Sequence, residues 1–206
     1  MKGYRCALKS DQHTMNKMPK CIIVTGRPGS GKATLCKRLQ PRLWLPVVSR
    51  DEIKEGYVNT FGVKHDQLPA DTNAVATNFF FEIVNQYLEK NVSIIVEAAF
   101  QHKVWEPRVI EIAKMADPFM VICSVSAETA ANRHLQRGLA EPEREYYHGD
   151  NRVVVYRETG VVLPAGEYET PHLDMPTIRV STEGEYSPTI DEIVERIRLN
   201  NSDGRN

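Results

Sequence analysis

The stretch CIIVTGRPGSGKAT, residues 21–34, joins an apolar run to a glycine-rich loop that ends in a lysine. The first five residues favour a strand buried on both faces, because such strands are almost continuously apolar. The loop matches the pattern G-x-x-x-x-G-K, in which backbone N–H groups surround phosphate oxygens and the lysine adds a cation. A helical pattern follows, and the positive end of that helix would face the same anion. The stretch therefore predicts a strand, a phosphate-binding loop and a helix.

One position departs from this pattern, because Ala33 stands where a hydroxyl normally binds Mg²⁺ and Thr34 follows it. The loop is therefore either a damaged nucleotide site or a variant that works differently. The segment GRPGSGKAT resembles the loop of adenylate-kinase-like P-loop kinases, in which a small residue follows the lysine and a threonine comes next. The resemblance implies that Mg²⁺ is held largely by phosphates and water, with Thr34 as a metal-binding candidate, so that the loop is functional. The residues expected to bind the nucleotide are Gly26, Arg27, Pro28, Gly29, Ser30, Gly31, Lys32, Ala33 and Thr34.

A second segment, VVSRDEIKEG at residues 47–56, resembles part of the polynucleotide 5′-hydroxyl kinases, the zeta-toxin-like kinases and related phosphotransferases. The resemblance implies that Asp51 is the catalytic base, with Arg50 and Lys54 beside the acceptor. Phosphoryl transfer to an alcohol needs a carboxylate that accepts the proton and positions the oxygen in line. Alternatively, Asp51 is only a residue of a helix N-terminus, favoured there by the helix dipole.

Further charged residues stand where the same kinases place functional groups. Glu97 ends the apolar run SIIVE and is a candidate to contact the acceptor or to bind Mg²⁺, directly or through water, since a buried carboxylate without a role would be costly. Arg133 and Arg137 lie four residues apart on one helix face, where the resemblance implies arginines that clamp the phosphates as a lid closes. Alternatively, both arginines belong to a solvated helix face. Lys32, Asp51, Arg133 and Arg137 are the catalytic candidates.

The rest of the chain alternates short β-branched runs with longer amphipathic segments, which is typical of α/β proteins. Further strands are expected at 45–49, 92–100, 119–126 and 177–182. Proline and glycine are expected to end helices at Pro41 and Gly138, and Ser187 is expected to cap the last helix, at 187–200. The charged and proline-rich region of about 138–176 is interpreted as a lid insertion and not as a second domain. Together with the resemblance, this order implies a three-layer P-loop NTPase fold with a parallel five-stranded sheet in the order 2-3-1-4-5.

Composition limits the classes of function. The 206 residues carry 27 acidic and 26 basic side chains, so no global field marks a nucleic-acid binder. No run of 18 apolar residues spans a membrane, and four dispersed cysteines favour a reducing cytoplasm. A single domain is expected at 19–200, between disordered segments at 1–18 and 201–206.

These observations and the resemblance predict a kinase that uses ATP and Mg²⁺ to phosphorylate a hydroxyl of a small molecule, such as a sugar, a nucleoside-like compound or an antibiotic. Two alternatives stay open. The acceptor could be a polynucleotide 5′-hydroxyl, which the SRDEI segment fits equally well, or the chain could be a non-catalytic ATP-binding regulator.

Overall fold

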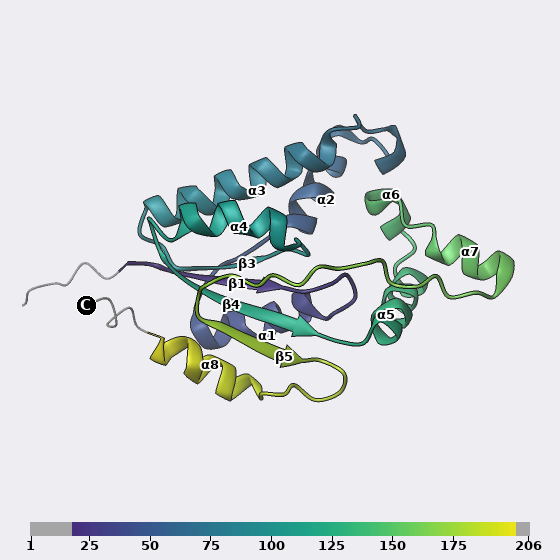
Figure 1. Ribbon diagram of the computed structural model, residues 1–206. Coiled ribbons are helices and arrows are strands. Elements are labelled where there is room, and N and C mark those ends of the chain that lie inside the picture. The colour runs from purple at the N-terminus through teal and green to yellow at the C-terminus, as the bar shows by residue number, and fades with distance from the viewer. Residues whose placement is uncertain (1–17, 201–206) are drawn as a thin grey trace, which may run out of the picture.

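The computed structural model describes residues 18–200, in which one sheet of five parallel strands has the order β2-β3-β1-β4-β5 (Figure 1). This order and the all-parallel pairing confirm the prediction. The expected disorder of the two chain ends concerns residues that, apart from Met18, lie outside the described range. The strands are β1 (Lys20–Thr25), β2 (Val47–Ser49), β3 (Ile94–Glu97), β4 (Asp117–Ser124) and β5 (Thr177–Ser181).

Helices cover both faces of the sheet, because the strands are apolar on both sides. Ile22 and Val24 of β1 face the cluster that contains α1 and α8, whereas Cys21 and Ile23 face α3 and α4. The molecule therefore has three layers (Figure 1). The helices are α1 (Lys32–Leu43), α2 (Arg50–Phe61), the 3₁₀ turn η1 (His65–Gln67), α3 (Thr72–Glu89), α4 (His102–Ile112), α5 (Ala127–Ala140), α6 (Arg144–His148), α7 (Arg152–Thr159) and α8 (Ile190–Leu199).

Three expected helix ends are wrong. Pro41 lies inside α1, which continues to Leu43. Gly138 lies inside α5, where a Cβ would stand 2.7 Å from a methyl group of Val153 in α7, so the glycine allows two helices to approach closely. The last helix begins after Thr189, and this residue forms a capping box with Glu192.

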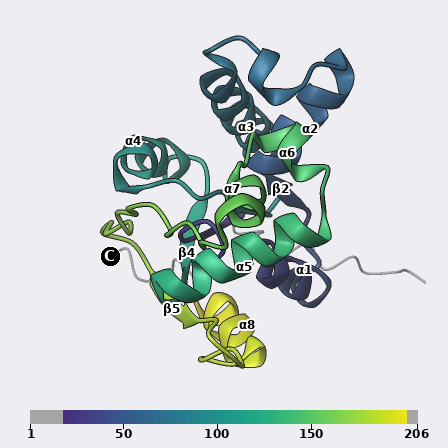
Figure 2. The ribbon, with the colours of Figure 1, turned by 90° about the vertical axis from the view of Figure 1, so that its right-hand side faces the viewer.

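The insertion after α5 contains two short helices and an extended return segment. Helix α6 packs against α2 and η1, and α7 packs against α5 (Figure 2). Residues 160–176 then return to the start of β5, passing β1 and the beginning of α4, where Tyr168 bonds to Thr25 and His172 stacks on His102. The insertion therefore borders the end of the sheet at which the phosphate-binding loop stands.

Candidate functional site

The loop between β1 and α1 has the backbone geometry of an anion-binding loop. Gly26, Gly29 and Gly31 have φ angles of 143°, 82° and 81°, values that side-chain-bearing residues rarely adopt. A Cβ on Gly29 would collide with the carbonyl oxygen of Ala130. Gly31 caps α1 without any side-chain hydrogen bond, so the first N–H groups of this helix are available to a phosphate.

Lys32 and Glu97 form a buried ion pair beside this loop. The Nζ of Lys32 donates to the carbonyl of Arg27 at 3.1 Å and lies 3.9 Å from Oε1 of Glu97. Glu97 also accepts a hydrogen bond from the hydroxyl of Ser49 at 2.8 Å, since these residues stand opposite each other at the ends of β3 and β2. Burial raises the pKa of Glu97, against the opposing effects of Lys32 and Ser49. Glu97 is therefore a buried neighbour of Lys32.

Asp51 projects from the first turn of α2, directly after β2. Its side chain is 57% exposed, and its Oδ1 lies 3.7 Å from a guanidinium nitrogen of Arg50. That arginine also donates to the side chain of Asn73 at 2.9 Å, which anchors it to α3. Asp51 is thus an accessible carboxylate at the edge of the sheet that carries the phosphate loop.

The two arginines of α5 that were predicted to clamp the phosphates take different positions. Arg133 donates to the carbonyl oxygens of Thr182 and Glu183 at 2.5 and 3.1 Å, and the hydroxyl of Thr182 donates to the carbonyl of Ser30 at 2.9 Å. Arg133 is therefore held on the β5 side of the phosphate loop.

Arg137 stands one helical turn later, and its surroundings connect it to the two carboxylates. Burial and then Arg144 lower its pKa, whereas Glu141, Asp51 and Glu97 act in the opposite direction. Lys32, Asp51 and Glu97 therefore stand at one end of the sheet, and the charges of the two carboxylates act on Arg137. Arg133 lies beside Gly31 of the phosphate loop.

The remaining predicted residues divide between α1 and α2. The side chains of Ala33 and Thr34 are exposed in the first turn of α1. Lys54 is buried on α2. Within residues 18–200 no group of three or more His, Cys, Asp or Glu side chains could hold a metal ion. A bound Mg²⁺ therefore fits only if phosphates and water supply most of its ligands, with Glu97 or Thr34 nearby.

Sequence reasoning missed a buried hydroxyl network behind the loop. The hydroxyl of Thr25 accepts from Nε1 of Trp105 at 3.0 Å and donates to the carbonyl of Ala98 at 3.0 Å. The Tyr168 hydroxyl lies 3.2 Å from the Thr25 oxygen and 3.1 Å from the carbonyl of Phe100, so its one proton is shared between these two acceptors. No local pattern marks Tyr168, because its partners are distant in sequence.

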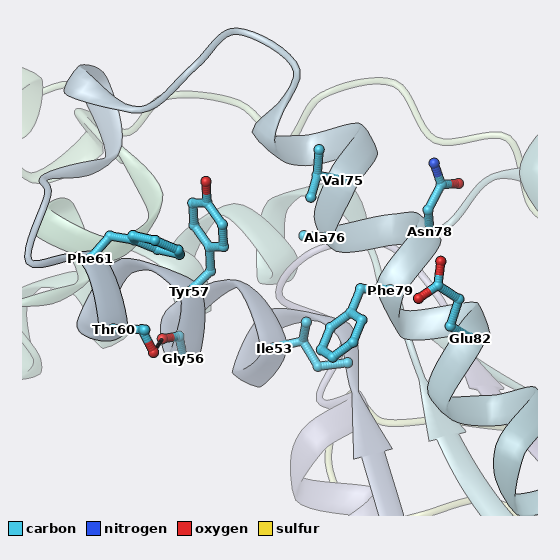
Figure 3. A pocket seen from close by; sticks show the side chains of 10 residues that line it. All are labelled: Ile53, Gly56, Tyr57, Thr60, Phe61, Val75, Ala76, Asn78, Phe79 and Glu82. Carbon is cyan, nitrogen blue, oxygen red and sulfur yellow. Dashed lines mark hydrogen bonds between the residues drawn. The ribbon is translucent and has the colours of Figure 1, made fainter.

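A separate cavity of about 640 Å³ lies between α2 and α3 (Figure 3). Ile53, Tyr57 and Thr60 line it from α2, and Val75 and Phe79 from α3. These α2 positions repeat at helical spacing on the side of the helix away from Asp51. None of the catalytic or nucleotide-binding candidates lines this cavity, whose polar lining includes Asn78 and Glu82 of α3.

Comparison with known proteins identifies the class. The profile of the AAA domain family AAA_33 matches residues 21–151, and the chain belongs to this family. Over 177 residues the chain is 25% identical to adenylate kinase isoenzyme 5 of Bos taurus, covering 72% of this chain and 30% of that protein. The chain thus spans less than a third of that relative.

Solved structures give the same class. A provisionally assigned kinase of Chloroflexus aurantiacus j-10-fl has a TM-score of 0.71 at 23% identity, covering 89% of this chain and 98% of that one. The APS kinase CysC of Mycobacterium tuberculosis, solved with AMPPNP and APS, has a TM-score of 0.59 at 14% identity, covering 88% and 99%. These likenesses show the fold, which is a kinase-like P-loop fold, as the resemblance implied. None of the helices within residues 18–200 is long and apolar enough to cross a membrane.

Proposed function

We propose that the protein is an ATP- and Mg²⁺-dependent kinase that transfers the γ-phosphate to a hydroxyl of a small molecule. The observation that carries this proposal is the accessible carboxylate of Asp51, which stands at the same end of the sheet as Lys32, Glu97 and Arg137. A nucleotide-binding loop alone would fit many functions. A free carboxylate and a lid arginine beside the loop are what transfer to an alcohol requires.

The chain's own groups divide the work of the reaction. The N–H groups of the loop and of the first turn of α1 hold the phosphates, and Lys32 exchanges the carbonyl of Arg27 for their oxygens. Asp51 accepts the proton of the acceptor hydroxyl. The acceptor oxygen forms a bond to the γ-phosphorus as the bond between the γ-phosphorus and the β-phosphate oxygen breaks. ADP leaves, and the exposed Asp51 returns its proton to solvent. Arg137 stabilises the charge on the transferred group.

Magnesium, when bound, would neutralise charge on the β- and γ-phosphates. Ala33 offers no hydroxyl to the magnesium ion, so Glu97 would orient a water bound to the ion. Thr34 would supply the nearest hydroxyl of α1. The Ser49 hydrogen bond holds the carboxylate of Glu97 in place for this task.

The charge balance of the chain bears on the class of acceptor. The near balance of 27 acidic and 26 basic residues favours a small molecule over a polynucleotide 5′-hydroxyl. A non-catalytic ATP-binding regulator would have no use for Asp51 or for Arg137. The dispersed cysteines favour action in a reducing cytoplasm.

The test is transfer of labelled γ-phosphate from ATP to a panel of sugars, nucleosides, antibiotics and 5′-hydroxyl oligonucleotides. We expect Asp51→Asn to lower turnover about 10²- to 10⁴-fold without weakening ATP binding. Glu52→Gln, one position further along the exposed side of α2, is the matched control and should keep the rate. A near-normal rate in Asp51→Asn would reject the proposed base. ATP binding without transfer to any member of the panel would favour the regulator.

A further inference from the structure

A polar cavity of about 150 Å³ lies between the phosphate loop, strands β4 and β5, and the segment 160–176 that returns from the lid. The return segment crosses the sheet before it enters β5 (Figure 1). The lining side chains that carry nitrogen or oxygen are those of Arg27, Ser124, Tyr168, Thr170 and Arg179. Among the described residues no acidic side chain lines the cavity, which therefore holds two cations and no carboxylate.

This cavity opens on the face of the sheet away from α1. Ile178 and Val180, the neighbours of Arg179 in β5, pack in the cluster that contains α1 and α8. Side chains alternate along a strand, so Arg179 projects from the opposite face. Within the described part of the chain, Arg27 is the only expected nucleotide-binding residue that lines the cavity. The cavity therefore adjoins the phosphate loop without including Lys32.

The two arginines of the cavity lack counterions. Nη1 of Arg27 is buried and has no hydrogen bond among the described residues. Within residues 18–200 no ion pair joins Arg27 or Arg179 to an acidic side chain. Buried donors are normally satisfied and like charges repel, so two guanidinium groups around one small cavity point to an anionic occupant.

The other titratable groups of the lining supply no negative charge. Burial raises the pKa of the Cys123 thiol to about 12. Burial also raises the pKa of the Tyr168 hydroxyl, and the charge of Arg27 is among the smaller effects that oppose this rise. Both groups are therefore neutral near pH 7, and the charge of the two arginines is left uncompensated.

We propose that this cavity binds a phosphate group between Arg27 and Arg179, either as the free ion or as a monoester. Guanidinium groups present paired N–H donors that match the oxygens of a phosphate, and the hydroxyls of Ser124 and Thr170 add donors. A phosphate monoester carries a charge of about −1.5 to −2 near pH 7, which two arginines balance, whereas a carboxylate would balance only one.

The size of the cavity limits the occupant. Drug-sized ligands occupy pockets of about 300–1,000 Å³. A cavity of about 150 Å³ admits a phosphate group, while the rest of a larger compound would lie outside it. The site uses neither Asp51 nor Lys32, so the inference goes beyond the proposed kinase reaction and does not depend on it.

The experiment measures phosphate binding while the phosphate loop is occupied. Protein saturated with AMPPNP and Mg²⁺ is titrated with inorganic phosphate, methyl phosphate or acetate against chloride of equal ionic strength, and thermal unfolding is followed. Inorganic phosphate should stabilise the wild type saturably, and acetate should need at least about tenfold more for the same effect. Equal potency of acetate would contradict a phosphate site.

Methyl phosphate separates the two sources of a phosphate group. An effect equal to that of inorganic phosphate supports a site for the phosphate group of a larger compound. No effect of methyl phosphate supports a site for the free ion.

Arg179→Gln tests the site without changing the phosphate loop. We expect its half-saturation concentration for inorganic phosphate to rise at least about tenfold, because a charged donor is lost. The control Arg157→Gln removes the same charge from an exposed arginine of α7 and should match the wild type. Arg179 is exposed on the edge strand β5, so Arg179→Gln should unfold at the wild-type temperature when no anion is added. If it unfolds earlier, Arg27→Gln replaces it at AMPPNP concentrations that saturate that variant, with the same tenfold criterion.

Three results would overturn the proposal. Equal half-saturation in the wild type and Arg179→Gln would separate the bound anion from this cavity. No stabilisation beyond that of chloride would leave only water as the partner of Arg27. An effect of phosphate that disappears when AMPPNP is bound would place the anion in the phosphate loop.

The same samples keep this inference apart from the proposed function. Absence of stabilisation by AMPPNP itself would count against the kinase and not against the phosphate site. The titration would then be made on Lys32→Met, in which the phosphate loop lacks its cation, with and without Arg179→Gln. A tenfold dependence on Arg179 in that background would still support the site.

Discussion

Thr25 is the residue at which the phosphate loop is joined to the core, and Thr25→Val tests that role. The side chain is fully buried at the end of β1, one residue before Gly26. Valine keeps the shape of threonine and removes only the hydroxyl. The change therefore breaks the bonds to Trp105, Ala98 and Tyr168 without opening a cavity.

The magnitude follows from what is left unpaired. The indole of Trp105 is fully buried, so its N–H loses its acceptor and costs about 1–3 kcal/mol. The lost bond to the carbonyl of Ala98 adds about 1 kcal/mol. We expect the free energy of unfolding to fall by roughly 2–4 kcal/mol, a large part of a total of about 5–15 kcal/mol. Tyr168→Phe, which removes one partly exposed hydroxyl, should cost about 1 kcal/mol.

Urea unfolding followed by tryptophan fluorescence measures both variants, because Trp105 itself lies in the network. The double variant should lose less than the sum of the single losses, since Thr25 and Tyr168 share a hydrogen bond. A loss below 1 kcal/mol in Thr25→Val would mean that the indole finds another acceptor. Strict additivity would mean that Tyr168 does not contribute through Thr25.

Three further outcomes are expected. Gly29→Ala should weaken ATP binding at least tenfold in an equilibrium titration, because the φ of 82° at Gly29 and the nearby carbonyl of Ala130 leave no room for a Cβ. The control Gly166→Ala adds a Cβ in open space and should bind ATP normally. Burial raises the pKa of the Cys21 and Cys123 thiols to about 12, so iodoacetamide at pH 8 should alkylate them only in concentrated urea. Rapid labelling of the folded protein, detected by mass spectrometry, would contradict their burial. Burial also raises the pKa of Glu97 above its ordinary value of 4.5, so the folded state binds more protons than the unfolded state in the window between 4.5 and the raised pKa. This carboxyl should therefore lower the free energy of unfolding as pH rises through that window. Urea unfolding at several pH values should show that Glu97→Gln removes this part of the pH dependence, and an unchanged pH dependence would contradict the raised pKa.

The strands and the phosphate loop could be predicted because their signals are local. Continuous apolar runs mark strands that helices cover on both faces, and the loop glycines and Lys32 are contiguous in the sequence. The sheet order came from the resemblance of the motifs to known kinases, and the parallel pairing confirms it.

Helix ends were harder to predict, because tertiary contacts override local signals. Gly138 is a helix-ending residue by propensity, but it lies inside α5 because Val153 of α7 needs the space of its missing side chain. The cap of α8 could have been found, since the sequence TIDE at residues 189–192 has the spacing of a capping box. Ser187 offers a competing cap two residues earlier, and the structure uses Thr189.

Site residues could likewise be predicted where their signals are local, and not where they depend on tertiary contacts. Asp51 and Glu97 could be proposed because Asp51 follows β2 and Glu97 ends β3, and parallel strands of one sheet end at a common edge. Tyr168 could not, because it lies in an irregular segment and reaches Thr25 across 143 positions of sequence.

The two carboxylates of the site also explain why the proposed base is Asp51 and not Glu97. Glu97 is buried, accepts a hydrogen bond from Ser49 and lies beside Lys32, so it is less accessible to an acceptor hydroxyl than Asp51 is. A proton transferred to it would have no path to water and would break its pairing with the lysine that holds the phosphates. Asp51 is more than half exposed and can pass a proton to solvent after each turnover. The burial of Glu97 and the exposure of Asp51 therefore favour Asp51 as the proposed proton acceptor and leave Glu97 beside Lys32.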